Sequence, residues 1–366
     1  MYFIRILSIT LILSGFLGCS SVTSNSESPS SDDPADQSEW LLPDDEVING
    51  GVSKDGIPSV DEPKFKPTSE IDYVQDERLI VGVRIGNTIK GYPHQVLDFH
   101  EIINDKIGDQ PICITYCPLT GSGIAWDRTI DGEAVEFGVS GLLFRNNLIP
   151  YDRKTDTNYS QILMQGVRVE RSGEKLETFQ VIETTWSTWK QMFPNAQVLS
   201  KDTGFGNLGY QGYLYGEDYL DEDSPPLFPI SADEKALGGR GYKERVFGII
   251  DSDEGILDTQ NFVIDNFGNG INLKQTSTRH ADYIVVGSAS LNFAVAFERE
   301  LSDGTKPNFQ PVQNALPVIL TDDDGNRWDV FGYAVEGPRK VERLTPAVAF
   351  TSYWFAWGEF FLWGSF

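Results

Sequence analysis

Apolar and polar residues alternate in short runs from about Pro67 onward, and turn residues separate the runs. Residues 79–85 and 88–92 have the β-branched and aromatic character of strands. Gly86 and Asn87 between them are typical of a two-residue hairpin loop. The pattern therefore predicts a β-hairpin at the start of a folded body.

Two later stretches continue the strand pattern. Residues 111–117 predict a single strand rich in β-branched and aromatic side chains. Residues 123–128 and 133–139 are joined through Asp131 and Gly132, a favoured turn pair, and predict a second hairpin.

Helical spacing of apolar residues occurs in three places. Residues 95–104 follow Pro93, and residues 186–193 end at Pro194, which cannot continue a helix. The apolar residues 354–363 predict a helix packed on a sheet. We therefore predict an α+β fold that is rich in β-structure, with a few short helices.

The C-terminal third resembles an earlier part of the chain. Residues 124–132 align with 295–303, and residues 80–84 align with 246–250 at nearly the same offset. The alignment predicts two similar β-rich halves from an internal duplication. The body then divides into an N-terminal half at 67–200, a loop-rich connection at 201–241, and a C-terminal half at 242–366.

The first residues have the pattern of an exported lipoprotein. Arg5 precedes an apolar stretch at 6–17, which is too short to span a bilayer comfortably and is typical of a signal peptide. Residues 16–19 (Phe-Leu-Gly-Cys) resemble a lipobox, so residues 1–19 are predicted to be a lipoprotein signal with Cys19 as the lipidated residue. An ordinary secretory signal with an incidental cysteine is the alternative. Residues 20–66 are predicted to be a flexible tether, because most of this stretch is acidic and rich in Ser and Pro.

The net charge of the protein limits the classes of molecule that it can bind. The net charge is −25, and removal of residues 1–19 takes away one arginine and no acid, which leaves −26. Such a charge argues against nucleic acid and against anionic membrane surfaces as partners. We expect a protein of the cell envelope, anchored to a membrane (the outer membrane is favoured) through the lipid on Cys19. Its other partner would be an unidentified envelope protein or small molecule. No cofactor is implied.

Most candidate catalytic and metal-binding residues lie between His94 and Gly123. Cys113 and Cys117 lie on the predicted strand at 111–117, where four residues span roughly 13 Å, too far for a disulfide. At least one of the two is therefore expected to be a free thiol. The Pro- and Gly-rich turn after Cys117 can direct backbone N–H groups at a thiolate, although a cysteine buried as a small apolar residue is an equal alternative.

Several runs of the chain resemble the DUF3179 family of uncharacterised bacterial and archaeal proteins. The resemblance covers roughly residues 58–366 and is carried by the runs 98–105, 115–121, 137–143, 151–155 with Gln161, and 353–357. It implies no established activity. Many relatives have Cys-Pro-Leu-Cys where this chain has Cys-Pro-Leu-Thr at 117–120, which suggests thiol–disulfide or peroxide chemistry. Thr120 excludes a dithiol cycle through positions 117 and 120 here.

Three interpretations of the thiol remain. The favoured one is a monothiol redox role, with Cys117 as nucleophile, His100 as base or orienting partner, and the backbone from Thr120 to Gly123 stabilising the thiolate. Cys113 as a resolving thiol is the second. The third is a degenerate member with an inert Cys117, acting as a structural or interaction lipoprotein.

Two further sites are predicted. Cys113, Cys117 and His100, with His94 nearby, are ligand types that suit zinc or copper, although their spacing matches no standard signature. Such a site would make the protein a non-enzymatic module that binds a metal or a small ligand.

The second predicted site would bind a small ligand. Asp152, Arg153 and Gln161 form the predicted ligand-binding group, in which Arg153 would clamp a carboxylate or phosphate. The alternative is an Asp–Arg pair that holds a loop.

Overall fold

The computed structural model describes residues 39–206, 208–253 and 256–363. Strands predominate, and four short α-helices are present in this part of the chain, which confirms the predicted β-rich fold with a few short helices. The helices are α1 (His94–His100), α2 (Trp186–Met192), α3 (Glu234–Leu237) and α4 (Trp354–Phe361), with short 3-10 turns at η2 (Asp44–Glu46), η3 (Thr68–Glu70), η4 (Glu217–Leu220) and η5 (Asp265–Phe267). Cys19 and the predicted signal lie outside the described residues.

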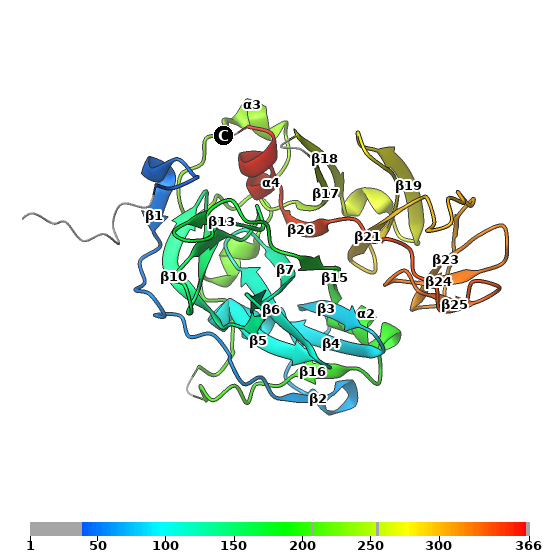
Figure 1. Cartoon of the computed structure of the whole chain (residues 1–366), viewed down its shortest axis with the longest axis horizontal. Helices are drawn as coiled ribbons and strands as arrows, with labels where there is room; N and C mark the ends of the chain where they lie inside the picture. The colour runs from blue at the N-terminus through cyan, green and yellow to red at the C-terminus, as the bar shows by residue number, and fades with distance from the viewer. Residues whose placement is uncertain (1–38, 207, 254–255, 364–366) are drawn as a thin grey trace, which may run out of the picture. The chain divides into compact units, whose positions relative to one another are not determined.

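The N-terminal half of the body contains three sheets and one small ribbon (Figure 1). The first sheet has the order β15 (Val181–Thr185), β3 (Leu79–Ile85), β4 (Thr88–Pro93), β16 (Gln197–Leu199), β2 (Phe65–Pro67). The second has the order β14 (Thr178–Phe179), β7 (Ser122–Asp127), β6 (Gln110–Cys117), β5 (Ile102–Ile107). The third has the order β1 (Val47–Asn49), β10 (Phe137–Phe144), β11 (Asn147–Asp152), β12 (Asn158–Ser160), β13 (Gln165–Arg168), and the ribbon pairs β8 (Thr129–Ile130) with β9 (Glu133–Ala134).

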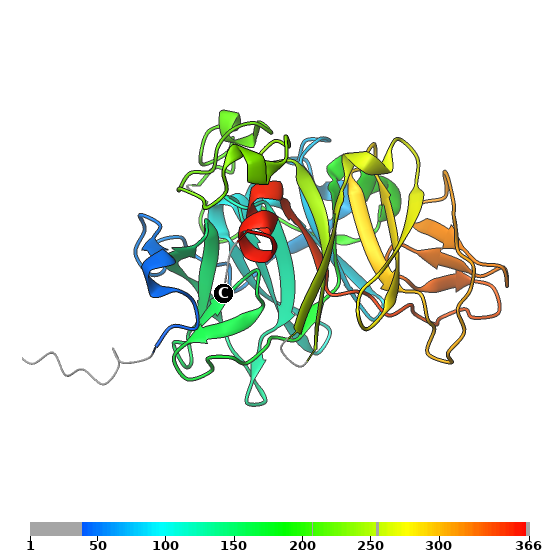
Figure 2. The same cartoon turned by 90° about the horizontal axis from the view of Figure 1, so that it is seen from above.

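The C-terminal half contains three smaller sheets. Their orders are β18 (Ile256–Val263), β17 (Arg245–Asp253), β26 (Ala349–Tyr353); β19 (Asn272–Ser277), β20 (Asp282–Ser288), β21 (Phe293–Glu298); and β22 (Gln310–Pro311), β23 (Val318–Thr321), β24 (Arg327–Asp329), β25 (Ala334–Glu336). After β25 the chain returns, so that β26 contacts β7 and β15 of the N-terminal half and α4 follows it (Figures 1 and 2). Residues near the end of the chain thus lie against strands from its first half.

The same local arrangement of a strand and a helix occurs once in each half. In each half, a strand that pairs with the first strand of a hairpin leads directly into a helix that opens with Trp-x-x-Trp: β15 precedes α2, and β26 precedes α4. The second tryptophan of each helix lies over a glycine of the paired strand. A Cβ atom added to Gly82 would lie 2.3 Å from Trp189, and one added to Gly248 would lie 1.9 Å from Trp357. Both rings are fully buried, so these glycines give the helices room to pack on the sheets.

Three predictions about local structure need correction. The helix predicted at 95–104 ends at His100, and residues 102–107 form β5 instead. The turn at Asp131 and Gly132 forms, but only the two-residue strands β8 and β9 pair across it. Strand β7 instead pairs with β6, and β10 pairs with β1 and β11 in another sheet. The tether predicted for 20–66 is also too long, because β1 and β2 pair with strands of the body. Residues 39–66 therefore belong to the folded part of the chain.

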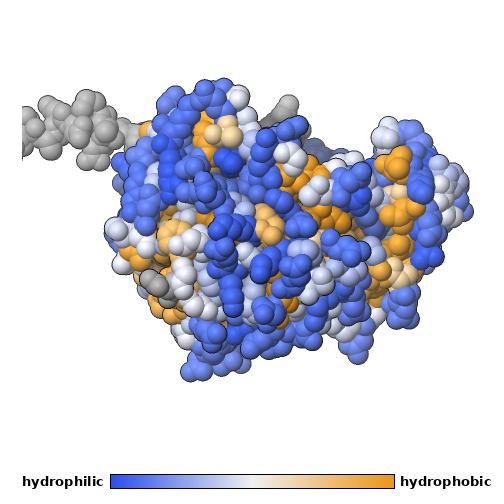
Figure 3. Space-filling model, turned by 90° about the horizontal axis from the view of Figure 1, so that it is seen from below, coloured by the Kyte–Doolittle hydropathy of each residue, from blue (hydrophilic) through white to orange (hydrophobic). Residues whose placement is uncertain are grey.

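The connection at 201–241 lies on the N-terminal half. Its described residues form η4, α3 and irregular segments, and Tyr213 and Tyr219 from this connection pack into the same core as Cys117. Among the helices of the described residues, none has the length and apolar character needed to cross a membrane. Hydrophilic side chains predominate on the face drawn in Figure 3, with apolar patches between them.

Candidate functional site

The site begins at the turn between β6 and β7. Cys117 is the last residue of β6 and pairs with Ser122, the first residue of β7. The Cys117 side chain is 1% exposed, and its thiol donates a long hydrogen bond of 3.5 Å to the carbonyl oxygen of Asn146. The thiol is thus enclosed in the protein core rather than open to solvent.

The environment of the thiol opposes ionisation. Burial raises the pKa of Cys117 to about 11, and the negative charge of Glu101 adds to the increase. Hydrogen bonds from the Thr120 side chain and from the backbone of Thr120 and Leu148 lower the pKa but do not outweigh burial. The turn therefore does direct hydrogen bonds at the sulfur, but the predicted thiolate at neutral pH is not what this environment favours.

The His100 ring makes its hydrogen bonds to groups other than the Cys117 thiol. Its Nδ1 lies 2.6 Å from the carbonyl oxygen of Pro58, and its Nε2 lies 2.8 Å from the hydroxyl oxygen of Tyr210. Burial lowers the pKa of His100. With both ring nitrogens engaged away from Cys117, the predicted role of His100 as base or orienting partner is replaced by a structural one.

Glu101, rather than His100, is the ionisable residue of this segment whose charge acts on the Cys117 thiol. It follows α1 directly with a φ of 58°, a conformation that residues other than glycine rarely adopt. Its carbonyl oxygen accepts a 2.7 Å hydrogen bond from the backbone N–H of Tyr116, the residue before Cys117. The carboxyl is 6% exposed, and burial raises the pKa of Glu101 to about 8. A buried acid with a raised pKa on a strained backbone is a typical feature of a functional site.

Thr120 and Gln161 meet in a buried polar network beneath the turn. Asn147 Nδ2 donates to Thr120 Oγ1 at 3.0 Å and to Gln161 Oε1 at 2.7 Å. Ser122 Oγ lies 2.8 Å from Thr120 Oγ1 and donates to Gln161 Oε1 at 2.9 Å, while Gln161 Nε2 donates to Thr115 Oγ1 at 3.0 Å. Gln161 thus holds the turn after Cys117, and its polar groups are engaged by the protein rather than free for a ligand.

Tyrosines cover the turn from distant parts of the chain. Tyr213 and Tyr219 donate hydrogen bonds of 2.7 Å and 2.9 Å to the carbonyl oxygens of Pro118 and Leu119, and their rings stack with centroids 6.0 Å apart. The backbone N–H of Tyr353 donates to the carbonyl oxygen of Thr120 at 2.8 Å. A further charged group, Lys243, lies 3.5 Å from the Tyr219 ring centroid.

Gly121 is needed at this turn for two reasons. Its φ is 59°, and a Cβ atom there would lie 2.8 Å from the Tyr353 ring. The glycine of the turn therefore allows the tyrosine of the C-terminal half to close over it.

Helix α1 carries two further ionisable side chains. His94 and Asp98 lie one helical turn apart on α1, which contacts β6, and the His94 ring lies 4.2 Å from the Tyr116 ring. Glu183 on β15 lies 3.3 Å from His94 and is paired with Arg245 on β17. Burial alone would raise the pKa of Glu183, but Arg245 and His94 outweigh it and hold that pKa below its usual value.

The predicted pair Asp152 and Arg153 lies elsewhere. Asp152 lies five positions after Asn147 on β11, a distance of roughly 17 Å along the strand. Asp152 accepts hydrogen bonds from Lys154 N at 3.0 Å and Thr155 N at 2.6 Å, so it holds its own loop. Arg153 pairs with other acids, namely Asp55 at 3.1 Å, Asp61 at 2.8 Å and Glu136 at 3.1 Å. With its guanidinium shared among these carboxylates, the loop interpretation fits better than a clamp for an anionic ligand.

The predicted metal site is not assembled either. Cys113 and Cys117 are both free and lie four residues apart on the regular strand β6, so they cannot approach each other without breaking it. Burial also raises the pKa of Cys113 well above its ordinary value. No group of three or more His, Cys, Asp or Glu side chains suited to a metal ion occurs in the described part of the chain. A resolving role for Cys113 and a Cys113–Cys117–His100 metal site are both inconsistent with this geometry.

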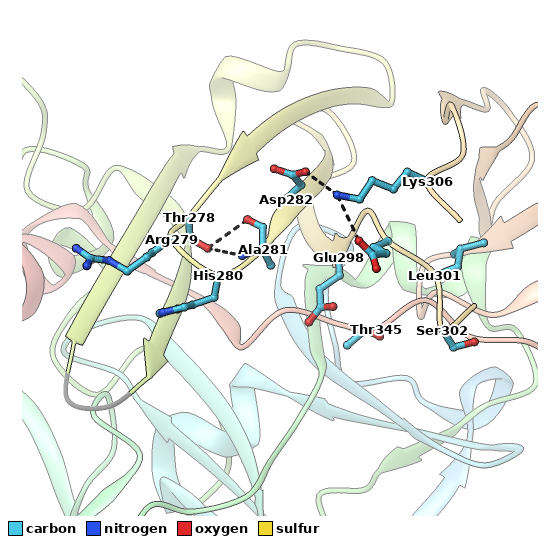
Figure 4. Close-up of a pocket in the computed structure, with 11 residues that line it drawn as sticks. Thr278, Arg279, His280, Ala281, Asp282, Glu298, Leu301, Ser302, Lys306 and Thr345 are labelled. Carbon is cyan, nitrogen blue, oxygen red and sulfur yellow. Dashed lines mark hydrogen bonds and ion pairs between the residues drawn. The ribbon is translucent and has the colours of Figure 1, made fainter. Parts of the chain in front are cut away.

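Two open pockets lie away from the turn after Cys117. A polar pocket of about 410 Å³ is lined by residues from Thr278 to Thr345, and its Lys306 is paired with Asp282 at 3.2 Å and Glu300 at 3.3 Å (Figure 4). A more apolar groove of about 620 Å³ includes Leu41, Ile250 and Leu257 among its lining residues. Neither lining includes a residue of the predicted site.

Sequence patterns missed part of the candidate site. Asp98 and Glu101 lie in the run 98–105 and were not assigned roles there, although an acid-rich run close to a thiol was a usable signal. Tyr213 and Tyr219 gave no signal, because tyrosines in a Gly- and Pro-rich connection are typical of surface loops.

Comparison with known proteins gives a single finding. The family described as "Protein of unknown function (DUF3179)" has a sequence model that matches residues 54–362, which is most of the chain. No match was found among curated proteins or among solved structures.

Proposed function

The chain belongs to the DUF3179 family, and we propose that this member is a lipid-anchored envelope protein whose Cys117 performs thiol–disulfide exchange with Glu101 as its proton acceptor. The observation that carries the proposal is the buried Glu101 carboxyl on a strained backbone, whose negative charge acts on the thiol. A carboxyl with an ordinary pKa would be a poor base for a thiol. The Glu101 pKa of about 8 lies closer to the pKa of the thiol, so proton transfer from the thiol is less unfavourable.

The Cys117 proton passes to the Glu101 carboxylate, and the sulfur attacks one sulfur of a small disulfide. The disulfide bond of the reagent breaks, a mixed disulfide forms on Cys117, and Glu101 returns the proton to the leaving thiolate. A second small thiol then releases Cys117 and carries away the mixed-disulfide partner. Because Thr120 stands where relatives have a cysteine, resolution must come from outside the protein.

The pH dependence of alkylation tests the proposal. In the full chain with Cys19→Ala, iodoacetamide labelling of Cys117 should show a step near pH 8, as Glu101 ionises, followed by a rise toward pH 11. Glu101→Gln should remove the step and leave a smooth rise of about tenfold per pH unit. Mass spectrometry reads Cys113 and Cys117 separately across pH 6–10. Identical profiles for the two chains, or labelling of Cys117 only after denaturation, would rule out the exchange role.

The second half offers a matched control. In the alignment of 124–132 with 295–303, Cys117 corresponds to Ser288, which is also buried at the end of a strand before a turn. A chain with Cys117→Ser and Ser288→Cys places a thiol in that turn without Glu101 beside it. Its labelling profile should lack the step near pH 8.

Membrane anchoring rests on the lipobox-like run that ends at Cys19. We expect the wild-type chain to fractionate with membranes and to carry acyl groups on Cys19, because two or three buried acyl chains give stable anchoring. Cys19→Ala should move the protein to the soluble fraction, whereas Ser20→Ala should not. Cell fractionation and mass spectrometry of the N-terminal peptide measure this, and an unmodified Cys19 in mature wild-type protein would contradict the anchor.

The internal duplication also belongs to this proposal. Its support is that both halves have a hairpin flanked by a later strand (β15-β3-β4 and β26-β17-β18), followed by a three-stranded meander (β5-β6-β7 and β19-β20-β21). The corresponding turn residues Gly121 and Asn292 have similar φ values of 59° and 52°. Under this hypothesis, only the first copy has the thiol. The second copy contributes Tyr353, which packs over the turn after Cys117.

A further inference from the structure

The apolar groove of about 620 Å³ is lined by residues of both halves of the body. Leu41 and Leu176 come from the first half, and Ile250, Leu257 and Val348 come from the second. Leu41, Leu257 and Val348 are 53%, 47% and 43% exposed. Exposed apolar side chains around a hollow of this size are typical of a binding site, because ligand pockets commonly measure about 300–1,000 Å³.

Three polar side chains of the second half line the same groove. They are Asp251 on β17, Tyr283 on β20 and Glu298 on β21. Tyr283 and Glu298 are direct partners in the antiparallel ladder, so their side chains lie on one face of the sheet. Asp251 is joined to the turn before β20, because its carboxylate accepts hydrogen bonds from Thr278 Oγ1 and from the backbone N–H of His280. The apolar groove therefore has a polar wall.

Glu298 is the member of this wall that lacks a partner. Among the residues that the structure describes, none makes a hydrogen bond or an ion pair with its carboxylate. The side chain points away from Lys306, which pairs with Asp282 and Glu300 instead (Figure 4). Glu298 is only partly buried, so a ligand in the groove can reach it.

The polar wall has a surplus of negative charge. Burial alone would raise the pKa of Asp251, but hydrogen bonds from Thr278 and His280 outweigh it and hold that pKa below its usual value. Asp251 is therefore ionised at neutral pH. Partial burial raises the pKa of Glu298, and repulsion from Asp251 and Glu300 adds to the increase. A cation next to Glu298 would relieve this repulsion.

The lining also includes a lysine. Lys175 Nζ donates a 2.7 Å hydrogen bond to Ser252 Oγ. One ammonium group thus stands against the two carboxylates of Asp251 and Glu298. The balance favours a positively charged ligand, and the net charge of −25 acts in the same direction.

We propose that the groove binds a single-chain amphiphile with a protonated amine. The ammonium group pairs with Glu298 beside the Tyr283 ring, whose face attracts cations, and the hydrocarbon chain lies along Leu41, Leu257 and Val348. The site is separate from the turn after Cys117 and does not depend on the exchange role.

The test compares three ligands with the same eight-carbon chain: octylammonium, neutral 1-octanol and octanoate. Each is titrated below its micelle concentration into the full chain with Cys19→Ala, at pH 8 in about 0.15 M sodium chloride, and isothermal titration calorimetry measures the dissociation constant. We expect octylammonium to bind at one saturable site, with a dissociation constant at least about tenfold lower than that of octanoate. This comparison needs no variant of the groove.

Variants separate the groove from the general charge of the protein. Glu298→Gln should weaken octylammonium binding by about fivefold or more and leave that of 1-octanol within about twofold, since only the charged contact is lost. Glu62→Gln removes an exposed acid outside the groove and should change neither affinity.

A second pair of variants tests the apolar walls. Leu257→Asn should weaken the binding of octylammonium and of 1-octanol by about fivefold, because part of the contact with the chain is lost. Leu227 is 51% exposed, close to the 47% of Leu257, and lies outside the groove. Leu227→Asn should leave both affinities unchanged.

Four results would overturn the proposal. They are the absence of saturable octylammonium binding, an equal affinity for octanoate, an unchanged affinity in Glu298→Gln, and equal losses in Glu298→Gln and Glu62→Gln. The last result would assign the binding to the overall charge of the protein.

Discussion

Glu101→Gln is expected to raise the free energy of unfolding by on the order of 5 kcal/mol at pH 9, and by only about 1 kcal/mol at pH 5.5. Burial raises the pKa of Glu101 in the folded protein from 4.5 to about 8. The neutral acid is therefore compatible with the fold. The contribution of this group to the free energy of unfolding is complete below pH 4.5, falls as the pH rises above 4.5, and is lost once the pH has passed about 8. Glutamine stays neutral at every pH, so the variant avoids this loss. Urea denaturation at pH 5.5, 7 and 9 measures the difference.

A matched acid controls for the high net charge of the protein. Glu62 is exposed, and Glu62→Gln removes the same charge from the surface. Its effect on the free energy of unfolding should stay within about 0.5 kcal/mol at each pH. If Glu101→Gln gives an equal change at pH 5.5 and pH 9, the carboxyl is not buried as a neutral acid and the proposed base is lost with it.

Gly248→Ala should destabilise the protein by at least about 3 kcal/mol, which corresponds to a fall of roughly 4 °C or more in the melting temperature of a chain of this size. The added methyl group would lie 1.9 Å from the Trp357 ring, which is fully buried and cannot move outward without disturbing α4. Gly82→Ala should act in the same direction through Trp189, at 2.3 Å. Thermal unfolding followed by tryptophan fluorescence measures both effects.

Two further variants show whether the ring contact is the cause. Gly206 has open space around it and no positive φ, so Gly206→Ala should change the melting temperature little. Trp357→Leu removes the clashing ring, and the double variant with Gly248→Ala should be destabilised by less than the sum of the single variants. Additive effects would mean that Gly248 is needed for another reason.

Local patterns predicted the elements that depend on neighbouring residues. The hairpin of β3 and β4 formed where strand character met a Gly86-containing turn, and α2 ended just before Phe193-Pro194 as expected. The second hairpin was mispredicted because β7 and β10 find better partners in β6 and β11, and such pairing depends on residues that are distant in the sequence.

The site was predicted in position but not in its chemistry. The sequence placed Cys117 and Thr120 at the turn, and the structure brings these two together. It could not indicate that Tyr213 and Tyr353 cover the turn, since they lie 96 and 236 residues beyond Cys117. Burial raises the pKa of the thiol, and Glu101, rather than His100, is the ionisable residue whose charge acts on it.

The contact between Tyr353 and the Thr120 turn has a consequence for biosynthesis. A ribosome makes roughly 5–20 residues per second, so residue 353 follows residue 117 by roughly 10–50 s. During that interval the thiol of the nascent chain lacks part of its cover and is open to oxidants and to other cysteines. Chaperones that bind the emerging N-terminal half would therefore protect Cys117 until the last strand arrives.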